Sequence, residues 1–300
     1  MTLLGYLTQR NLVESSGAHI IASPIRLVFK KGGIGLVDLE RDENGTVRVE
    51  AKGDLLLIEI DRPKKLNGFT PKMFEELGSA YNTLESDKFR CGVLHANGDS
   101  FTAGLDLPEI FPLIKAGKEL VPLEYVDPFG LRPPMRTTPL VVAVKGYCYT
   151  LGIELMLAAD IVIAANDTRF SQLEVKRGVM ATGGATIRMV ERAGWGNAMK
   201  FLLTGDEFSA DTALRMNFVQ EVVGSGMELV RAMEVAENIA SQAPLAVRAT
   251  MRSAQTALGK NSAAAVSEFK SVQSLLLNSV DAAEGLASFV ERRPAKFIGR

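Results

Sequence analysis

The chain has 300 residues, and 47% of them are hydrophobic, so it can bury a large core in one big domain or two small ones. Its 34 basic and 35 acidic residues give a net charge of −1, which predicts no basic surface for nucleic acid or an anionic membrane. No apolar run approaches the roughly 18 to 20 residues that span a bilayer. The first residues also lack the charged region and apolar block of a secretory signal.

Cysteine and histidine usage narrows the chemistry. Cys91 and Cys148 are the only cysteines, and they lie far apart without a C-x-x-C spacing. This pattern predicts a reducing, cytoplasmic location, no disulfide framework and no zinc site. With only His19 and His95 present, neither a Ser-His-Asp triad nor a His-rich metal site is expected. Acid–base chemistry in this chain would therefore rest on carboxylates.

Residues 1–45 differ from the rest of the chain. They mix short apolar pieces with a glycine-containing stretch over residues 30–35 and show no sustained hydrophobic period. The glycines do not form the G-x-G-x-x-G pattern of a nucleotide-binding loop. We therefore predict an N-terminal extension of uncertain structure over residues 1–45.

From residue 46 onward, short aliphatic runs alternate with helical patterns, as they do in β/α units. Residues 46–51 and 55–60 predict the two strands of a hairpin, which ends before Pro63 because proline cannot continue the ladder. Thr70 is positioned to cap a helix whose first residue is Pro71. Further strands are expected at residues 91–95, 140–145, 160–165 and 218–223.

Two later regions depart from this alternation. Residues 108–139 contain seven prolines, which exclude a single long helix and predict a mobile or irregular segment. The side chains of this segment that are available to line a pocket are Phe111, Leu113 and Phe129. After residue 227 the chain is almost entirely helical, with breaks at Pro244 and near Gly259. This helical tail is expected to pack against a neighbour.

Two isolated acids stand out in an otherwise apolar region. Glu154 falls in the first turn of a short apolar helix, and Glu174 follows 20 positions later. A carboxylate in such a setting is costly unless it has a partner or a role. Glu154 fits a helix N-terminus, where the dipole favours an acid, and Glu174 fits a loop carboxylate paired with Lys176 or Arg177. The alternative is that the two acids form a catalytic pair.

Seven short segments between residues 46 and 297 carry a family resemblance. They are DRPKKLN from Asp61, SFTAGLDL from Ser100, PLVVAVKGY from Pro139, Glu154-Leu155 with Ala159-Asp160, FSQLE ending at Glu174 with Gly178, Leu203-Thr204-Gly205, and the tail from Glu284 to Phe297. In this order they resemble the crotonase (enoyl-CoA hydratase/isomerase) superfamily over most of the chain.

The resemblance implies an α/β fold with a crotonase-like spiral of ββα units. Residues 46–224 would form the spiral core that binds an acyl-CoA, and residues 225–300 a C-terminal helical region that builds trimers, often paired into hexamers. The coenzyme A thioester is then the substrate, and neither a separate cofactor nor a metal is implied. No nucleic-acid or membrane partner is expected.

The family's shared chemistry is stabilisation of a thioester enolate by two backbone N–H groups. The resemblance places these donors at Ala103 and at Leu151, three residues before Glu154, with Gly152 as the fallback. One such preorganised donor is often worth roughly 3 to 4 kcal/mol. The first N–H groups of a helix beginning near Leu151 would have no intrahelical partner and would carry the positive end of its dipole.

The chain departs from the family in this turn, because Thr150-Leu151-Gly152 replaces a run of glycines and should narrow the pocket near the thioester. Lys64 would meet CoA phosphates, and Lys296 and Phe297 would reach the adenine end of a neighbour's CoA. Asp106 could touch the ligand, but a cap on the segment that follows it is favoured. The full set of implied substrate or CoA contacts is Lys64, Leu66, Ala103, Leu105, Asp106, Leu107, Tyr147, Leu151, Lys296 and Phe297.

These features favour an enoyl-CoA hydratase that adds water to a trans-2-enoyl-CoA. Glu154 and Glu174 would hold the water, one taking its proton while a proton reaches Cα, and close carboxylates titrate as a coupled pair. Spacing does not assign acid and base between them. An enoyl-CoA isomerase or another enolate-using enzyme, which needs one base, is the alternative. A non-catalytic binding or assembly member of the family is a third interpretation.

Overall fold

The computed structural model describes residues 26–30, 33–37 and 43–300, in two compact units, Met1–Arg41 and Asp42–Arg300. In the first unit, strands β1 (Arg26–Lys30) and β2 (Gly33–Val37) form an antiparallel hairpin. The remainder of the predicted N-terminal extension lies outside the described residues, apart from Glu43 to Gly45, which belong to the second unit.

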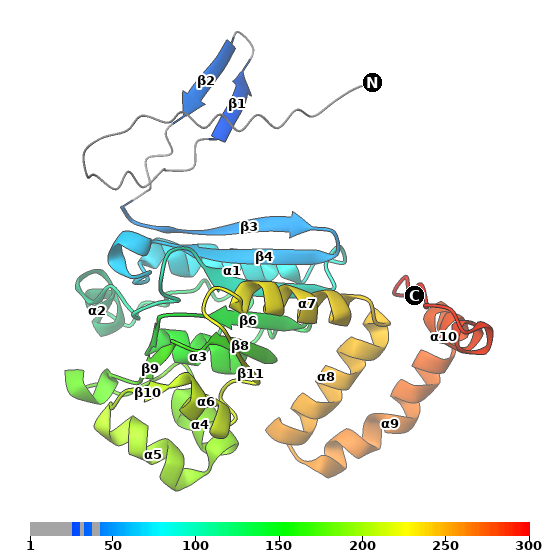
Figure 1. The fold of residues 1–300 in the computed structure, drawn as a ribbon. Coiled ribbons are helices and arrows are strands. Elements are labelled where there is room, and N and C mark those ends of the chain that lie inside the picture. The colour runs from blue at the N-terminus through cyan, green and yellow to red at the C-terminus, as the bar shows by residue number, and fades with distance from the viewer. Residues whose placement is uncertain (1–25, 31–32, 38–42) are drawn as a thin grey trace. The chain divides into compact units, whose positions relative to one another are not determined.

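The second unit is built on a six-stranded sheet in the order β11-β8-β6-β5-β4-β3 (Figure 1). The two strands of the predicted hairpin pair antiparallel, and the other neighbours run parallel. Every residue of β6 is buried, as expected for a central strand covered on both faces. The strands are β3 (Thr46–Lys52), β4 (Leu55–Asp61), β5 (Cys91–Ala96), β6 (Leu140–Val144), β8 (Ile161–Ala165) and β11 (Glu221–Val223).

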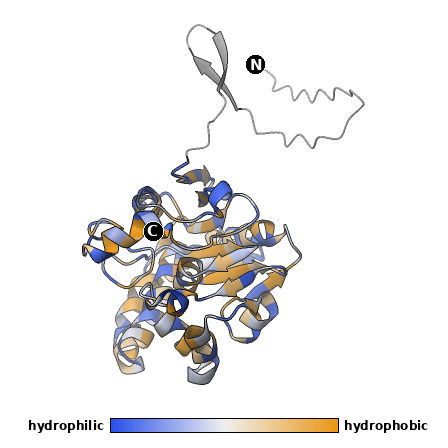
Figure 2. Ribbon diagram, turned by 90° about the vertical axis from the view of Figure 1, so that its left-hand side faces the viewer, coloured by the Kyte–Doolittle hydropathy of each residue, from blue (hydrophilic) through white to orange (hydrophobic). Residues whose placement is uncertain are grey.

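Helices cover both faces of this sheet, and hydrophobic residues concentrate between the layers (Figure 2). Helix α7 (Glu228–Ala240) covers one face, packing small residues such as Ala232 and Ala236 against β5 and β6. Helix α1 (Pro71–Leu84) belongs to the larger core on the other face. It begins as predicted, because Thr70 Oγ1 accepts a hydrogen bond from the Met73 N–H.

A small second sheet, in the order β10-β9-β7, brings the two isolated acids to one place. Strands β7 (Tyr147–Tyr149) and β9 (Arg169–Ser171) pair in parallel, and β10 (Phe208–Ser209) pairs antiparallel with β9. β7 leads into helix α3 (Leu151–Ala158), and β9 leads into the 3₁₀ helix η2 (Glu174–Arg177). Because parallel neighbours end at the same edge of a sheet, α3 and η2 start side by side.

The proline-rich segment is not irregular throughout. Helix α2 (Leu107–Lys115) occupies its first part, so the prediction of an irregular segment is wrong there, whereas the exclusion of a single long helix is confirmed. Pro108 lies in the first turn, where an N–H is not required, and Pro112 removes one internal hydrogen bond from a short helix. The other elements of this unit are η1 (Pro63–Lys65), α4 (Ala185–Ala193), α5 (Trp195–Thr204) and α6 (Ala210–Arg215).

Three C-terminal helices extend from the sheet as an arm (Figure 1). They are α8 (Pro244–Gly259), α9 (Ser262–Leu277) and α10 (Val280–Glu291), so the predicted breaks at Pro244 and near Gly259 are confirmed. No residue of α8 is buried, and α9 buries only Ala265. Leu258 and Phe289 are 80% and 82% exposed. The arm therefore leaves much of its apolar surface uncovered within one chain.

The turn after β4 depends on the Asn67 side chain, which is 1% exposed. Its Oδ1 accepts a hydrogen bond from the Arg62 N–H at 2.6 Å, and its Nδ2 donates to the carbonyls of Asn97 and Ser100, both at 2.8 Å. We expect Asn67→Ala to lower the free energy of unfolding by about 2 kcal/mol, because buried backbone groups lose their partners. Urea denaturation measures this. The exposed Asn197, changed to Ala, is the control and should stay within about 0.5 kcal/mol of the wild type; equal losses in both variants would contradict the prediction.

Candidate active site

Glu154 lies in the first turn of α3 and is 6% exposed. Its Oε1 accepts hydrogen bonds from the backbone N–H groups of Gly183 at 2.6 Å and Ala185 at 3.4 Å, at the start of α4. Burial raises the pKa of this carboxyl to about 7, the charge of Glu174 adds to the shift, and the two N–H donors oppose it. Glu154 can therefore hold or release a proton near neutral pH.

The loop before α4 fits closely over this carboxylate. A Cβ atom on Gly183 would lie 2.5 Å from Glu154 Oε2 and 3.0 Å from Phe129 Cδ1. Only glycine fits between these two side chains without displacing one of them. Phe129, one of the side chains expected to line a pocket, therefore lies next to the candidate acid. Phe111, on α2, is half exposed instead.

Glu174 opens η2 and is half-buried. Burial raises the pKa of its carboxyl, while its own backbone N–H opposes the shift. Within residues 43–300, its buried Oε2 has no hydrogen-bond partner. Lys176 pairs with Asp206 at 3.9 Å, and Arg177 donates to the Lys176 carbonyl. Glu174 is thus not a loop carboxylate satisfied by these neighbours, as one interpretation of the sequence held.

Gln172 is a candidate site residue that the sequence interpretation missed. It lies two residues before Glu174 and is 1% exposed, yet neither its Oε1 nor its Nε2 has a partner in the described part of the chain. A buried amide without partners is rare unless water or a ligand satisfies it. The signal available in the sequence was an amide side chain in the short segment between the apolar residues Phe170 and Leu173.

The two predicted oxyanion donors have different outcomes. Leu151 is the first residue of α3, so its N–H has no intrahelical partner, and the described residues supply no other. The Ala103 N–H, in contrast, donates to the Leu66 carbonyl at 2.9 Å. The prediction of Ala103 as an oxyanion donor is therefore wrong, because its N–H already donates to the Leu66 carbonyl.

The neighbouring free N–H group belongs to Leu105. The Phe69 N–H donates to the Gly104 carbonyl, and the Phe69 carbonyl accepts from the Asp106 N–H, both at 2.9 Å. In this parallel bridge the N–H of Leu105, which lies between Gly104 and Asp106, points away from Phe69. Gly104, with a φ of +109°, interrupts the strand-like alternation of N–H directions after Ala103. No partner of the Leu105 N–H occurs among residues 43–300. Leu105 and Leu151 thus each carry an N–H group without a partner among residues 43–300, and so does Gly152, the fallback donor in the first turn of α3.

The other predicted substrate contacts lie on several elements and differ in exposure. Lys64 is exposed in η1, Leu66 and Leu107 are also exposed, and Tyr147 is half-buried. Asp106 takes the N-cap position of α2, but its side chain does not cap the helix. It pairs with Arg62 at 2.7 Å instead, so the interpretation of its side chain as a cap is wrong.

Lys296 and Phe297 lie elsewhere in the same chain. They line a cavity of about 460 Å³ together with Leu55, the first residue of β4, whereas Lys64 lies beyond the last residue of that strand. Arg90 donates to the Phe297 carbonyl at 2.8 Å. These two residues and Lys64 are therefore at opposite ends of one strand.

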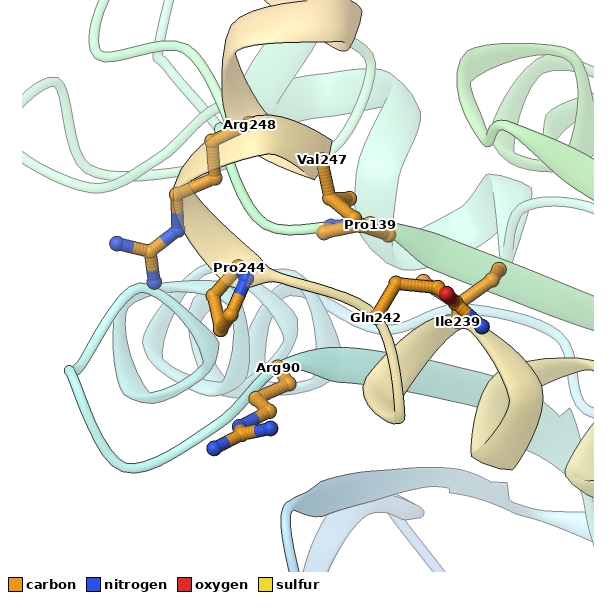
Figure 3. A pocket seen from close by; sticks show the side chains of 7 residues that line it. All are labelled: Arg90, Pro139, Ile239, Gln242, Pro244, Val247 and Arg248. Carbon is orange, nitrogen blue, oxygen red and sulfur yellow. The ribbon is translucent and has the colours of Figure 1, made fainter. Parts of the chain in front are cut away.

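A second cavity lies next to Arg90 and holds only about 10 Å³, room for one water molecule at most. Figure 3 shows its lining, which joins the end of α7 to the start of α8: Arg90, Pro139, Ile239, Gln242, Pro244, Val247 and Arg248. Neither cavity includes Glu154 or Glu174.

Neither a metal site nor a membrane-spanning helix occurs among the described residues. Within residues 43–300, no three His, Cys, Asp or Glu residues are grouped to hold a metal ion. Cys91 and Cys148 are buried free thiols. Among the helices that the structure describes, none is both long and apolar enough to cross a membrane.

The fold and this arrangement define the class of protein. Residues 50–300 match the family model for enoyl-CoA hydratase/isomerase, so the chain belongs to that family, within the crotonase superfamily. The family resemblance and the crotonase-like α/β fold expected from the sequence are thereby confirmed.

Individual relatives agree with this assignment. The chain is 30% identical to enoyl-CoA hydratase EchA19 of Mycobacterium tuberculosis over 84% of its own length and 96% of that protein. It is 28% identical to the 2,3-dehydroadipyl-CoA hydratase of Escherichia coli, over 82% and 96%. Among solved structures, a probable enoyl-CoA hydratase/isomerase from Mycobacterium abscessus is 44% identical with a TM-score of 0.82, over 85% of this chain and 98% of that one.

Proposed function

We propose that this protein is an enoyl-CoA hydratase that adds water to a trans-2-enoyl-CoA. The observation that carries the proposal is the pairing of a buried acid with a half-buried one, in which the charge of Glu174 contributes to a Glu154 pKa of about 7. The buried, unpartnered Oε2 of Glu174 is a second acceptor on the same side of the small sheet. The names of the relatives, which are hydratases, agree with this chemistry.

In the proposed reaction, the N–H groups of Leu105 and Leu151 bind the thioester carbonyl oxygen. Negative charge develops on that oxygen as water attacks Cβ, and fixed donors stabilise it without reorganisation. One glutamate takes a proton from the water as its oxygen bonds to Cβ. A proton from the glutamate pair then adds to Cα, and the carbonyl re-forms. A carboxyl with a pKa near 7 suits either part, because both protonation states are populated at neutral pH.

The proposal includes a homo-oligomer, a trimer or a pair of trimers. The arm of α8, α9 and α10 exposes many large apolar side chains, such as Leu258 and Phe289, and another chain would cover them. The position of Lys296 and Phe297 away from Lys64 supports contact with a neighbour's CoA rather than the chain's own. Sedimentation of the purified protein tests the oligomeric state.

Crotonyl-CoA tests the reaction directly. The purified full-length chain should remove the conjugated enoyl-thioester absorbance and form a product heavier by one water. If a 3-enoyl-CoA is isomerised while crotonyl-CoA stays unchanged, the isomerase alternative replaces this proposal. If calorimetry finds no acyl-CoA binding while the oligomer persists, the non-catalytic interpretation replaces both.

A further inference from the structure

Thr150 has a backbone conformation that threonine rarely adopts, with φ +46° and ψ −111°. Two hydrogen bonds hold it there. Its N–H donates to the Ser171 carbonyl at 2.9 Å, and its own carbonyl accepts from the Glu154 N–H at 3.2 Å. Glycine would take this conformation without strain, whereas a β-branched residue is destabilised in it. A side chain kept under strain beside an active site is reason to ask what that side chain does.

The Thr150 hydroxyl occupies the space next to Gly104. A Cβ built on Gly104 would lie only 2.1 Å from Thr150 Oγ1, so the hydroxyl takes the position that a side chain at 104 would need. Gly104 immediately precedes Leu105, and Thr150 immediately precedes Leu151. The hydroxyl therefore lies beside Gly104, the residue before one free N–H group, and belongs to the residue before the other.

This hydroxyl is available to a ligand. It does not cap α3, and no hydrogen bond to Thr150 Oγ1 occurs among residues 43–300. A threonine hydroxyl carries one donor hydrogen that rotates toward whichever acceptor is present. An oxygen atom bound by the N–H groups of Leu105 and Leu151 would be such an acceptor.

We propose that the Thr150 hydroxyl is a third hydrogen-bond donor to the thioester oxygen of the substrate, beside the backbone donors of Leu105 and Leu151. This inference rests on the proposed function and adds a side chain to an otherwise backbone-built oxyanion site. The hydroxyl strengthens its bond as negative charge develops on the oxygen, so it acts mainly on the chemical step rather than on substrate binding.

Three substitutions separate the hydroxyl from the other properties of Thr150. Thr150→Val keeps the shape and the strained backbone but removes the donor, Thr150→Ser keeps the donor, and Thr150→Gly removes both the donor and the strain. With crotonyl-CoA, we expect kcat to fall by at least about 10-fold in Thr150→Val and Thr150→Gly, while KM changes by less than about 3-fold. In Thr150→Ser, kcat should stay within about 3-fold of the wild type. Thr150→Gly should unfold at an equal or higher urea concentration, so its loss of rate would not reflect misfolding.

A spectroscopic measurement reports the hydrogen bond itself. Donors to the carbonyl of bound cinnamoyl-CoA shift its absorbance to longer wavelength, and this shift should shrink in Thr150→Val and Thr150→Gly and persist in Thr150→Ser. If Thr150→Val and Thr150→Gly match the wild type both in kcat and in the cinnamoyl-CoA absorbance shift, while the wild type hydrates crotonyl-CoA, this inference alone is overturned. If the wild type neither hydrates crotonyl-CoA nor shifts the cinnamoyl-CoA spectrum, the proposed function fails with it.

Discussion

Replacing either Glu154 or Glu174 by Gln is expected to lower kcat for crotonyl-CoA hydration by about 10³-fold or more. Each substitution preserves the side-chain shape but removes the group that exchanges protons with water or with Cα, and general acid–base catalysis contributes roughly 10² to 10⁴. Because the water is proposed to lie between both carboxylates, neither glutamate should compensate for the other. Steady-state kinetics at pH 7 measures the effect.

The matched control is Glu234→Gln on α7, an exposed glutamate that pairs with Arg231 at 2.9 Å. Its kinetics should equal those of the wild type. Full hydratase activity in either active-site variant would exclude the two-carboxylate mechanism. Isomerisation of a 3-enoyl-CoA that survives in Glu154→Gln would instead favour the isomerase alternative.

The same Glu154→Gln variant should gain stability as pH rises, relative to the wild type. Folding raises the pKa of Glu154 from 4.5 to about 7, so the folded chain binds this proton more tightly than the unfolded chain does. Ionising Glu154 therefore destabilises the fold, with no cost below about pH 4.5 and the full cost above about pH 7. A rise of the Glu154 pKa from 4.5 to about 7 corresponds to about 3 kcal/mol. Glutamine keeps an oxygen to accept from the Gly183 N–H but does not titrate.

Urea denaturation at pH 5, 6, 7 and 8 measures this difference. Between pH 5 and pH 8, the free energy of unfolding of Glu154→Gln minus that of the wild type should increase by about 2 to 3 kcal/mol. In Glu234→Gln the same difference should stay constant. A difference for Glu154→Gln that is also independent of pH would mean that burial does not raise the Glu154 pKa. The residue that the reaction requires would thus be one that weakens the fold at neutral pH.

Much of the fold could be predicted because its signals are local. The hairpin ending before Pro63 and the helix beginning at Thr70-Pro71 follow from residue types that dictate their own backbone conformations. Glu154 and Glu174 stood out for a similar reason, since an acid within an apolar run is conspicuous in any sequence. The order of the short motifs was enough to identify the family.

The details that could not be predicted depend on backbone geometry or on distant contacts. Ala103 and Leu105 lie in one motif, and the conformation of Gly104 between them decides which N–H remains free. The Gly183 N–H reaches Glu154 across 29 residues, a contact that no local pattern encodes. Asp106 has the right position to cap α2, but Arg62, 44 residues away, takes its carboxylate.

The pairing of β7 with β9 also has a consequence for how the chain tolerates changes in length. Glu154 follows the last residue of β7 by five positions, and Glu174 follows the last residue of β9 by three. An added residue in either short connection would turn the acid about its helix by about 100° or shift it along the chain, and would separate the two carboxylates. Insertions in the connection between α2 and β6 leave this spacing intact. The family's variation in loop length is therefore expected to fall outside residues 149–154 and 171–174, where a change of one residue alters the chemistry.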